Sequence, residues 1–145
     1  PGRVGEDGGP MSAWSDLSTA IRSAITGAGY VVPLAHEPEG WPSWAVGSFI
    51  GVRLSRAESM IDGSGAAMTP GTLTLTGLVG SAWDERVSAD QADDLARALR
   101  ALLETTAGLL SGAAQFVFES ADITRIPSGL YTVAVAFRVF HRESY

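Results

Sequence analysis

Apolar residues along this chain recur with two different periods, one of three to four residues and one of two. The longest helical pattern runs from Ser88 to Leu110. Its apolar stripe consists of Ala92, Leu95, Ala96, Leu99, Leu102, Leu103, Thr106, Leu109 and Leu110. We predict one amphipathic helix about 33 Å long. Leu99 and Leu102 are expected in the core that this helix anchors.

The beginning of this segment also carries helix signals. Ser88 and Gln91 have the spacing of a capping box, in which each side chain satisfies a free backbone amide of the first turn. Acidic residues stabilise the positive end of the helix dipole, and here they are Asp90, Asp93 and Asp94. Asp93 precedes Arg97 by four residues, so we expect an ion pair between them.

A shorter helical pattern runs from Met11 to Ala28. Its apolar face consists of Trp14, Leu17, Ala20, Ile21, Ala24, Ile25 and Ala28. The β-forming residues Tyr30 to Val32 follow it. Two prolines and a glycine between His36 and Trp44 then predict a loop.

Four further segments have the composition or the period of strands: 46–54, 72–78, 115–121 and 130–140. The last is apolar on both faces apart from Thr132 and Arg138, which indicates an interior strand with cover on each side. Residues Ser55 to Gly71 have no sustained period and hold three glycines. We therefore predict a long loop at the tip of a hairpin between the first two strands.

These elements predict the α+β fold class. We expect a single domain with a mostly antiparallel sheet of about four to five strands, packed by an N-terminal helix and a long central helix. The 145 residues are enough for one core. Residues 1–10 hold four glycines and two prolines and are interpreted as a disordered leader or tag remnant, which leaves 11–145 as the domain.

Composition excludes several functional classes. The chain has no cysteine, so disulfides, thiolate nucleophiles and zinc–thiolate sites are ruled out. Sixteen acidic residues against ten arginines, with no lysine, give a net charge of -6. Nonspecific nucleic-acid binding requires a basic surface that releases counterions, so this balance argues against it. No apolar run approaches the length of a membrane span.

No constellation of residues predicts catalysis, a cofactor or a metal. His36, Glu37 and Glu39 are neighbours in a proline-rich loop and lack the spacing that points several ligands at one centre. The only other histidine is His141. No Gly-x-Ser-x-Gly motif is present. Gly63-Ser64-Gly65 is too short for a phosphate loop and has no lysine to follow it.

Two groups of residues are candidates for contact with other proteins. Tryptophans are enriched at interface hot spots, and Trp41, Trp44 and Trp83 lie in or beside predicted loops. The predicted hairpin tip combines two apolar residues with charges of both signs, which suits a repeated contact. Its candidate interface residues are Arg53, Arg56, Glu58, Met60, Ile61 and Asp62. We expect this tip to order against a neighbouring subunit or against another protein of the same assembly, and the alternative is an idle surface loop.

In the order of its elements and the composition of its strands, the chain resembles the tail terminator proteins (tail-completion, minor tail protein U-like) of long-tailed phages and gene transfer particles. The resemblance rests on the opening helix that runs into AGYVV (28–32), the arginine-bearing strand GVRL (51–54) and the closing strand YTVAVAFRV (131–139). It spans most of residues 11–145 and includes no diagnostic motif.

The resemblance implies a structural virion protein without enzymatic activity. Such proteins form a homohexameric ring on the finished tail tube, end its polymerisation and present a surface to the head–tail connector. DNA passes their pore without specific binding, and they are assembled in the host cytoplasm. Two alternatives are another neck, connector or tail-tube-related protein, and a small-ligand-binding or enzymatic α+β domain. The second alternative requires a pocket with convergent polar groups.

The absence of cysteine and the poor spacing of the histidines generate the first testable prediction. Folding is expected to need no metal ion, because no set of ligands in the sequence converges on one centre. Exhaustive treatment with a chelator should leave the thermal unfolding curve unchanged. A large fall in the melting temperature would contradict this prediction.

Overall fold

The computed structural model describes residues 14–34, 38, 41–42, 46–56, 60–61, 67–80, 85–104 and 114–143. The elements follow one another as α1 (Trp14–Gly27), β1 (Ile50–Arg56), β2 (Met60–Ile61), β3 (Ala67–Val79), α2 (Glu85–Glu104), β4 (Ala114–Arg125) and β5 (Tyr131–Glu143). Two helices and an antiparallel sheet confirm the predicted α+β class.

The centre of the sheet is the pairing of β3 with β5. These two strands have 13 residues each and pair along their whole length, from Ala67 opposite Glu143 to Val79 opposite Tyr131. β1 and β4 are added on the two outer sides, which gives the order β1-β3-β5-β4, and the short β2 pairs with β3. All strand pairs are antiparallel. The sheet is therefore built around two strands that are far apart in sequence.

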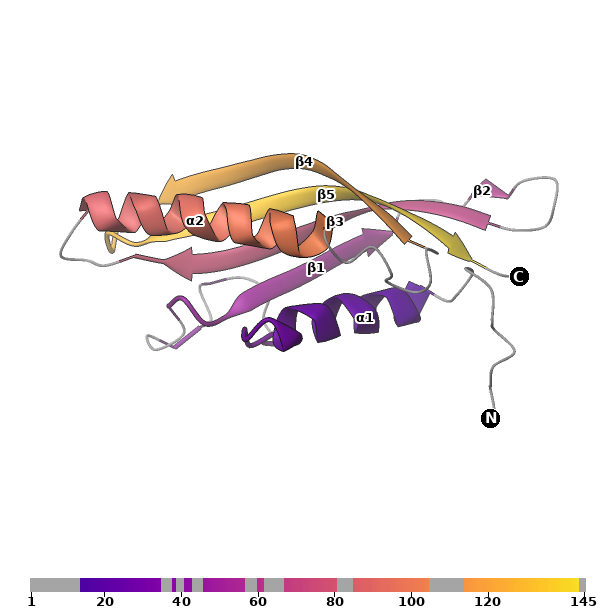
Figure 1. Ribbon diagram of the computed structural model, residues 1–145, viewed down its shortest axis with the longest axis horizontal. Coiled ribbons are helices and arrows are strands. Elements are labelled where there is room, and N and C mark those ends of the chain that lie inside the picture. The colour runs from indigo at the N-terminus through magenta and orange to yellow at the C-terminus, as the bar shows by residue number, and fades with distance from the viewer. Residues whose placement is uncertain are drawn as a thin grey trace.

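Both helices pack on the same face of this sheet (Figure 1). Alternate residues of the central strands face the helices and are buried. The fully buried residues on this face of β3 and β5 are Leu73, Leu75, Val133, Val135, Phe137, Val139 and His141. From β1, Ile50 and Val52 join the same core, as their alternation predicts.

The long helix α2 supplies the predicted apolar stripe. Leu99 is fully buried, which confirms its predicted place, and Leu102 packs partly buried against the core. The other buried members of the stripe are Ala92, Leu95, Ala96 and Leu103. The predicted ion pair between Asp93 and Arg97 is present at 3.1 Å.

The predicted start of α2 was wrong by three residues. The helix begins at Glu85, so Ser88 lies within its first turns and does not begin it. Ser88 is fully buried and lies close to Gly80, so tertiary packing sets its surroundings. The rest of the predicted segment, residues 105–110, lies outside the described residues.

The first helix is confirmed within a few residues of its predicted bounds. α1 buries Leu17, Ile21 and Ile25, which recur at four-residue steps. The segment after it approaches β1, because Val31 forms an isolated parallel bridge with Phe49. α1 therefore covers the side of the sheet that carries β1, next to α2.

Both helices approach the sheet at glycines of β3. A Cβ atom at Gly71 would lie 2.7 Å from Cη2 of Trp14 in α1 and 2.5 Å from the backbone oxygen of Ser55. A Cβ atom at Gly77 would lie 2.6 Å from Cδ2 of Leu95 in α2. These glycines set how closely each helix packs on the sheet.

The predicted loop over residues 55–71 was wrong where the structure describes it. Ser55 and Arg56 belong to β1, Met60 and Ile61 form β2, and residues 67–71 belong to β3, whereas residues 57–59 and 62–66 lie outside the described residues. Pairing with β5 continues to Ala67, so a long-range partner imposes strand structure where the local pattern is weak. Pro70 lies between the β1 and β2 ladders, a position where a residue without an N–H donor is tolerated.

Helix cover is found on only one face of β5 among the described residues, whereas we expected cover on both. β5 is an interior strand, since it pairs with β3 and β4. However, both described helices lie on one face, and the other face of β5 carries Thr132, Ala134, Ala136 and the exposed Arg138. Because Ala134 and Ala136 on this face are small and apolar, the sequence pattern of β5 is also compatible with a buried face. The turn before β5 has Gly129 at a φ of 91°, a backbone conformation that favours glycine.

Leu99→Ala is expected to lower the free energy of unfolding by about 2–5 kcal/mol, because it leaves a cavity under the sheet. Gln91→Ala on the exposed side of the same helix is the matched control and should change it by less than about 0.5 kcal/mol. Urea unfolding followed by circular dichroism measures both. Equal stabilities of the two variants would contradict the placement of Leu99.

Gly71→Ala is expected to destabilise the protein by about 1–3 kcal/mol, since a rigid backbone oxygen and the Trp14 ring must move. Gly77→Ala should cost less, because its nearest contact is the end of a flexible leucine side chain. Thermal unfolding of the two variants side by side tests this order. The reverse order would show that α2 approaches the sheet more tightly than α1.

Candidate functional site

The described residues hold no group that indicates metal chemistry. No three or more His, Cys, Asp or Glu side chains among them are placed to hold a metal ion. Within the same part of the chain, neither helix is long and apolar enough to cross a membrane. The features that remain are surfaces, and three of them stand out.

The first surface is the end of the hairpin formed by β1, β2 and β3. The strands at this end project beyond both helices, and β2 lies at its extremity (Figure 1). Met60 pairs with Met68 and Ile61 pairs with Ala67. The backbone of the predicted tip is thus partly a strand, supported by β3 and through it by β5.

The structure locates only some of the candidate interface residues. Arg53 is exposed in the middle of β1, on the face away from the helices. Trp41 packs edge-on against Phe49 just before β1, with ring centroids 5.6 Å apart. Arg56, Met60 and Ile61 have described backbones within strands. The other four, Glu58, Asp62, Trp44 and Trp83, lie outside the described residues.

The second surface is the sheet face away from the helices. Its central part carries the small or polar side chains Thr72, Thr74, Thr76, Ala134 and Ala136. An ion pair joins Arg138 of β5 to Glu119 of β4 at 3.0 Å. Val117 is 42% exposed beside them. This face is therefore mixed in character, without a large apolar patch among the described residues.

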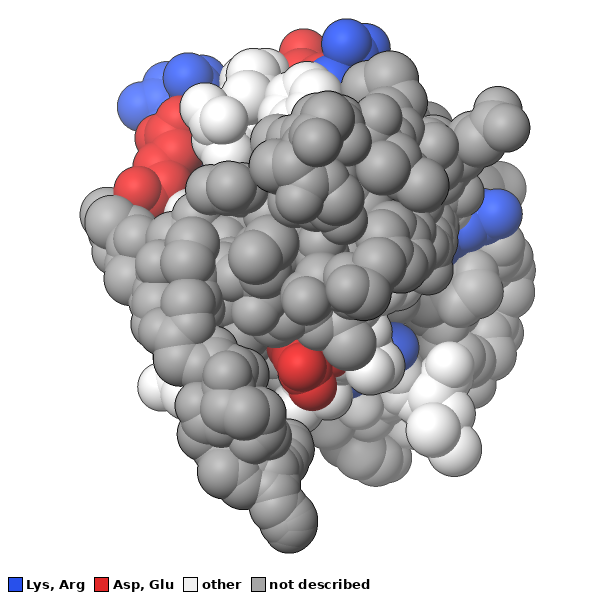
Figure 2. Space-filling view, turned by 90° about the vertical axis from the view of Figure 1, so that its right-hand side faces the viewer, with Lys and Arg blue, Asp and Glu red and all other residues white. Residues whose placement is uncertain are grey.

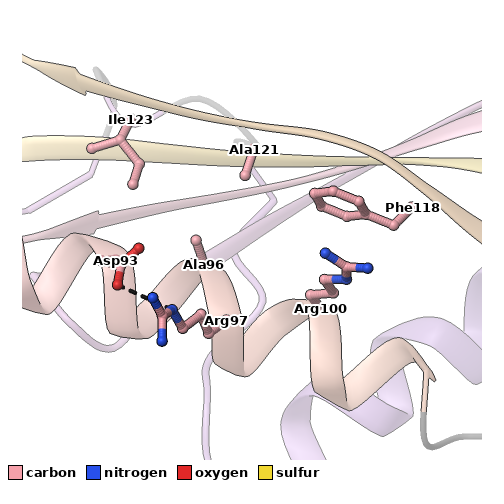
Figure 3. A pocket seen from close by; sticks show the side chains of 7 residues that line it. All are labelled: Asp93, Ala96, Arg97, Arg100, Phe118, Ala121 and Ile123. Atoms are coloured by element: carbon pink, nitrogen blue, oxygen red, sulfur yellow. Dashed lines mark ion pairs between the residues drawn. The ribbon is translucent and has the colours of Figure 1, made fainter.

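The third surface is a groove between α2 and β4, which we call the α2/β4 groove (Figure 3). Its volume is about 220 Å³, and it is lined by Asp93, Ala96, Arg97, Arg100, Phe118, Ala121 and Ile123. Small-molecule sites usually have about 300–1,000 Å³ and bury most of their ligand. The size of this groove fits one or two side chains of another protein better than a metabolite.

A bulge in β4 explains why the groove exists. The register of β4 against β5 shifts between Phe118 and Ser120. Before the bulge, Phe116 and Phe118 pack partly buried against the core. After it, residues 119–125 are all exposed, including Ile123 at 40%. α2 packs against β5, β3 and β4, and the part of β4 after the bulge stays exposed beside it.

Two arginine–carboxylate ion pairs lie along the α2 side of the groove. Arg97 pairs with Asp93 at 3.1 Å, and Arg100 pairs with Glu104 at 3.1 Å. The Arg100 guanidinium also lies over the ring of Phe118, 4.0 Å from its centroid. Exposed ion pairs of this kind are worth only about 0.3–0.5 kcal/mol, so both arginines can exchange their partners.

Sequence reasoning missed the α2/β4 groove. It depends on the offset of α2 from β4 and on the bulge, neither of which leaves a periodic signal. The available signal was Ile123, an apolar residue beyond the predicted end of the strand at 121. A single exposed apolar residue does not by itself indicate a binding surface.

Charged side chains of both signs lie on the described surface at one end of the molecule. Figure 2 shows acidic and basic side chains of described residues interspersed on the end of the molecule that it faces. Three of the described arginines, Arg97, Arg100 and Arg138, are paired with the carboxylates of Asp93, Glu104 and Glu119. This distribution agrees with the acidic net charge of the chain.

Comparison with known proteins gives a likeness in structure only. No protein-family model matches the chain, and no curated protein matches it in sequence. A chain in the solved virion of a native gene transfer agent particle has a similar fold, with a TM-score of 0.54 and 16% sequence identity. The similarity covers 87% of this chain and 91% of that chain. At this identity the likeness establishes a shared fold.

Proposed function

We propose that this protein is a structural component of the virion of a long-tailed phage or gene transfer particle. The observation that carries the proposal is the fold likeness to a chain of a gene transfer agent virion, which extends over nearly the whole of both chains. The resemblance of its strands and element order to tail terminator proteins supports the same assignment. A projecting hairpin end and a partly apolar groove provide surfaces for assembly.

Within the particle, we propose the role of tail terminator. Identical subunits join head to tail and close into a ring after a fixed rotation, which leaves a pore on the axis. One face of the ring matches the end of the tail tube, whereas the other face does not, so tube growth stops. The second face is then free to bind the head–tail connector. The expected ring is a homohexamer.

The proposed role involves no catalysis and no cofactor. Its chemistry is that of protein–protein contact, for which exposed strand edges and charged pairs are sufficient. DNA passes the pore without specific binding, since an acidic protein does not retain the phosphate backbone. The protein is assembled in the host cytoplasm and becomes part of the virion.

Purified protein tests this proposal directly. Light scattering after size-exclusion chromatography is expected to give a mass six times the 15.1 kDa of the chain, in equilibrium with the monomer. Negative-stain images should show rings with a central pore. Mixed with tail-tube protein from the same particle, the rings should bind one end of each tube and shorten the tubes.

The alternatives give different results in the same experiment. A tail-tube-related protein would polymerise into long tubes by itself. Another neck or connector protein would form rings that leave the tube length unchanged. A monomer at all concentrations that neither binds tubes nor affects their length would overturn the structural role.

A further inference from the structure

We infer that residues 32–34 of one copy of this chain add to the free edge of β4 in a second copy, so that the sheet continues from subunit to subunit. The inference rests on the proposed function, because it supplies the contact between neighbouring subunits of the ring. It is carried by the backbone, since the two outer edges of one sheet match in level, in face and in the direction of their free N–H and carbonyl groups.

Exposed large apolar side chains lie at the two outer edges of the sheet. Among the described residues they are Val31 and Leu34, in the segment that bridges to the start of β1, and Val117 and Ile123 of β4. Leu34 is completely exposed, at 103%. The described parts of the interior strands β3 and β5 contribute none. An exposed edge that carries apolar residues favours the addition of another strand.

On the β1 side, Val31 is bonded to β1 and Val32 is not. The N–H of Val31 donates to the carbonyl of Ser48, and the carbonyl of Val31 accepts from the N–H of Ile50, both at 2.9 Å. Backbone groups of an extended chain point alternately to either side, so those of Val32 point away from β1. No hydrogen bond of Val32 is found within the described part of the chain. Val32 therefore offers a free donor and a free acceptor at this edge.

At the opposite edge, the backbone groups of Ile123 also point outward. The N–H of Ile50 points to Val31 and away from β3, so Ile50 and its partner Gly77 exchange no hydrogen bonds. Bonded and non-bonded pairs alternate from strand to strand in an antiparallel sheet. Gly77 therefore directs its groups to Val133, and Val133 directs none to Ile123.

The neighbouring residue of β4 agrees with this direction. The carbonyl of Thr124 accepts a hydrogen bond from the hydroxyl of Thr132 in β5 at 3.3 Å, so it points inward. The groups of Ile123, one residue earlier, then point to the outside of the sheet. Residues 119–125 are all exposed, which leaves this edge open. We call residues 119–125 the free edge of β4.

Val32 and Ile123 also match in level and in face. One register line crosses the sheet from Ile123 through Val133 and Gly77 to Ile50. Val32 directly follows the residue that bonds to Ile50, so it lies at the same level. Val32 packs against the core under the helices, and Ile123 lines the α2/β4 groove on the same side of the sheet. The two residues are thus equivalent positions at opposite edges.

This match identifies a second copy as the partner. Two copies side by side in the same orientation bring the segment after α1 of one against β4 of the other. That segment bridges to β1 in parallel, whereas β4 runs antiparallel to β1 across the sheet, so the new pair is antiparallel. The contact joins two different edges and is therefore head to tail, as a ring requires.

The register of the contact follows from these positions. Val32 lies opposite Ile123, and Leu34 then lies opposite Ala121, which lines the α2/β4 groove (Figure 3). The exposed side chain of Leu34 gains an apolar neighbour in this way. Pro33 lacks an N–H, but the groups of this residue point back towards β1, so the new ladder needs no donor there.

Engineered cysteines test the contact, because the chain has none of its own. In the inferred register Val31 lies opposite Thr124 as a non-bonded pair, whose Cα atoms are about 4.5 Å apart and can be joined by a disulfide. Val31→Cys is mixed under oxidising conditions with Thr124→Cys carrying a longer tag. Ser120→Cys is the matched control, since it is exposed on the same face of β4 but about 13 Å further along the strand.

The expected result is a mixed, reducible dimer that forms several-fold more with Thr124→Cys than with Ser120→Cys. Equal yields with the two partners would overturn the inference. A dimer that Thr124→Cys forms by itself as readily as the mixed one would also overturn it, because two like edges would then be paired.

A proline substitution tests the backbone directly. Ile123→Pro removes an N–H that points out of the sheet, so the monomer should unfold at nearly the parent temperature. Its association, followed by light scattering, should need about a tenfold higher protein concentration or more. Ile123→Val keeps the N–H and is the matched control, which should associate like the parent. A folded Ile123→Pro variant that associates like Ile123→Val would contradict the inference, and if this variant does not fold, the cross-linking yields decide.

The inference and the proposed function fail separately. Rings that cap tubes, together with equal cross-linking to Thr124→Cys and Ser120→Cys, would retain the function and remove the inferred contact. Selective cross-linking without rings or tube capping would retain the contact, in an open filament of subunits, and remove the terminator role.

Discussion

The pairing of β3 with β5 is the interaction on which the rest of the structure depends. Their 13-residue ladder joins segments that lie on either side of α2 in sequence, and its helix-facing side chains are almost fully buried. Both α1 and α2 pack on the apolar surface that these helix-facing side chains form. The ladder also carries β3 out to Ala67, so the projecting hairpin end is a continuation of the core sheet.

Cover on a single face has direct consequences for function. Among the described residues, both helices lie on one side, so no described helix covers the opposite face of the sheet. The bulge in β4 adds an apolar groove beside α2, where Ile123 remains exposed. These surfaces are the structural features that support the assembly role we propose.

The candidate site could be predicted from the sequence only in part. Met60 and Ile61 were recognised as unusual, because apolar residues in a polar, glycine-bearing segment have no local place to be buried. Their strand structure was not recognised, because pairing with Met68 and Ala67 depends on the support of β5. The α2/β4 groove left no periodic signal at all. It follows from the position of α2 across the sheet.

Local periodicity by itself determined the α+β class, both helices and the buried stripe that includes Leu99, since the 3.6- and two-residue periods follow directly from backbone geometry. The composition of the chain, which has no cysteine, likewise showed that no thiol chemistry is available. Only the tertiary structure decided where strands end, which face of β5 is covered and where the groove lies. Small residues such as Ala134 and Ala136 suit a core or an open face equally well, and the choice belongs to the elements that pack beside them.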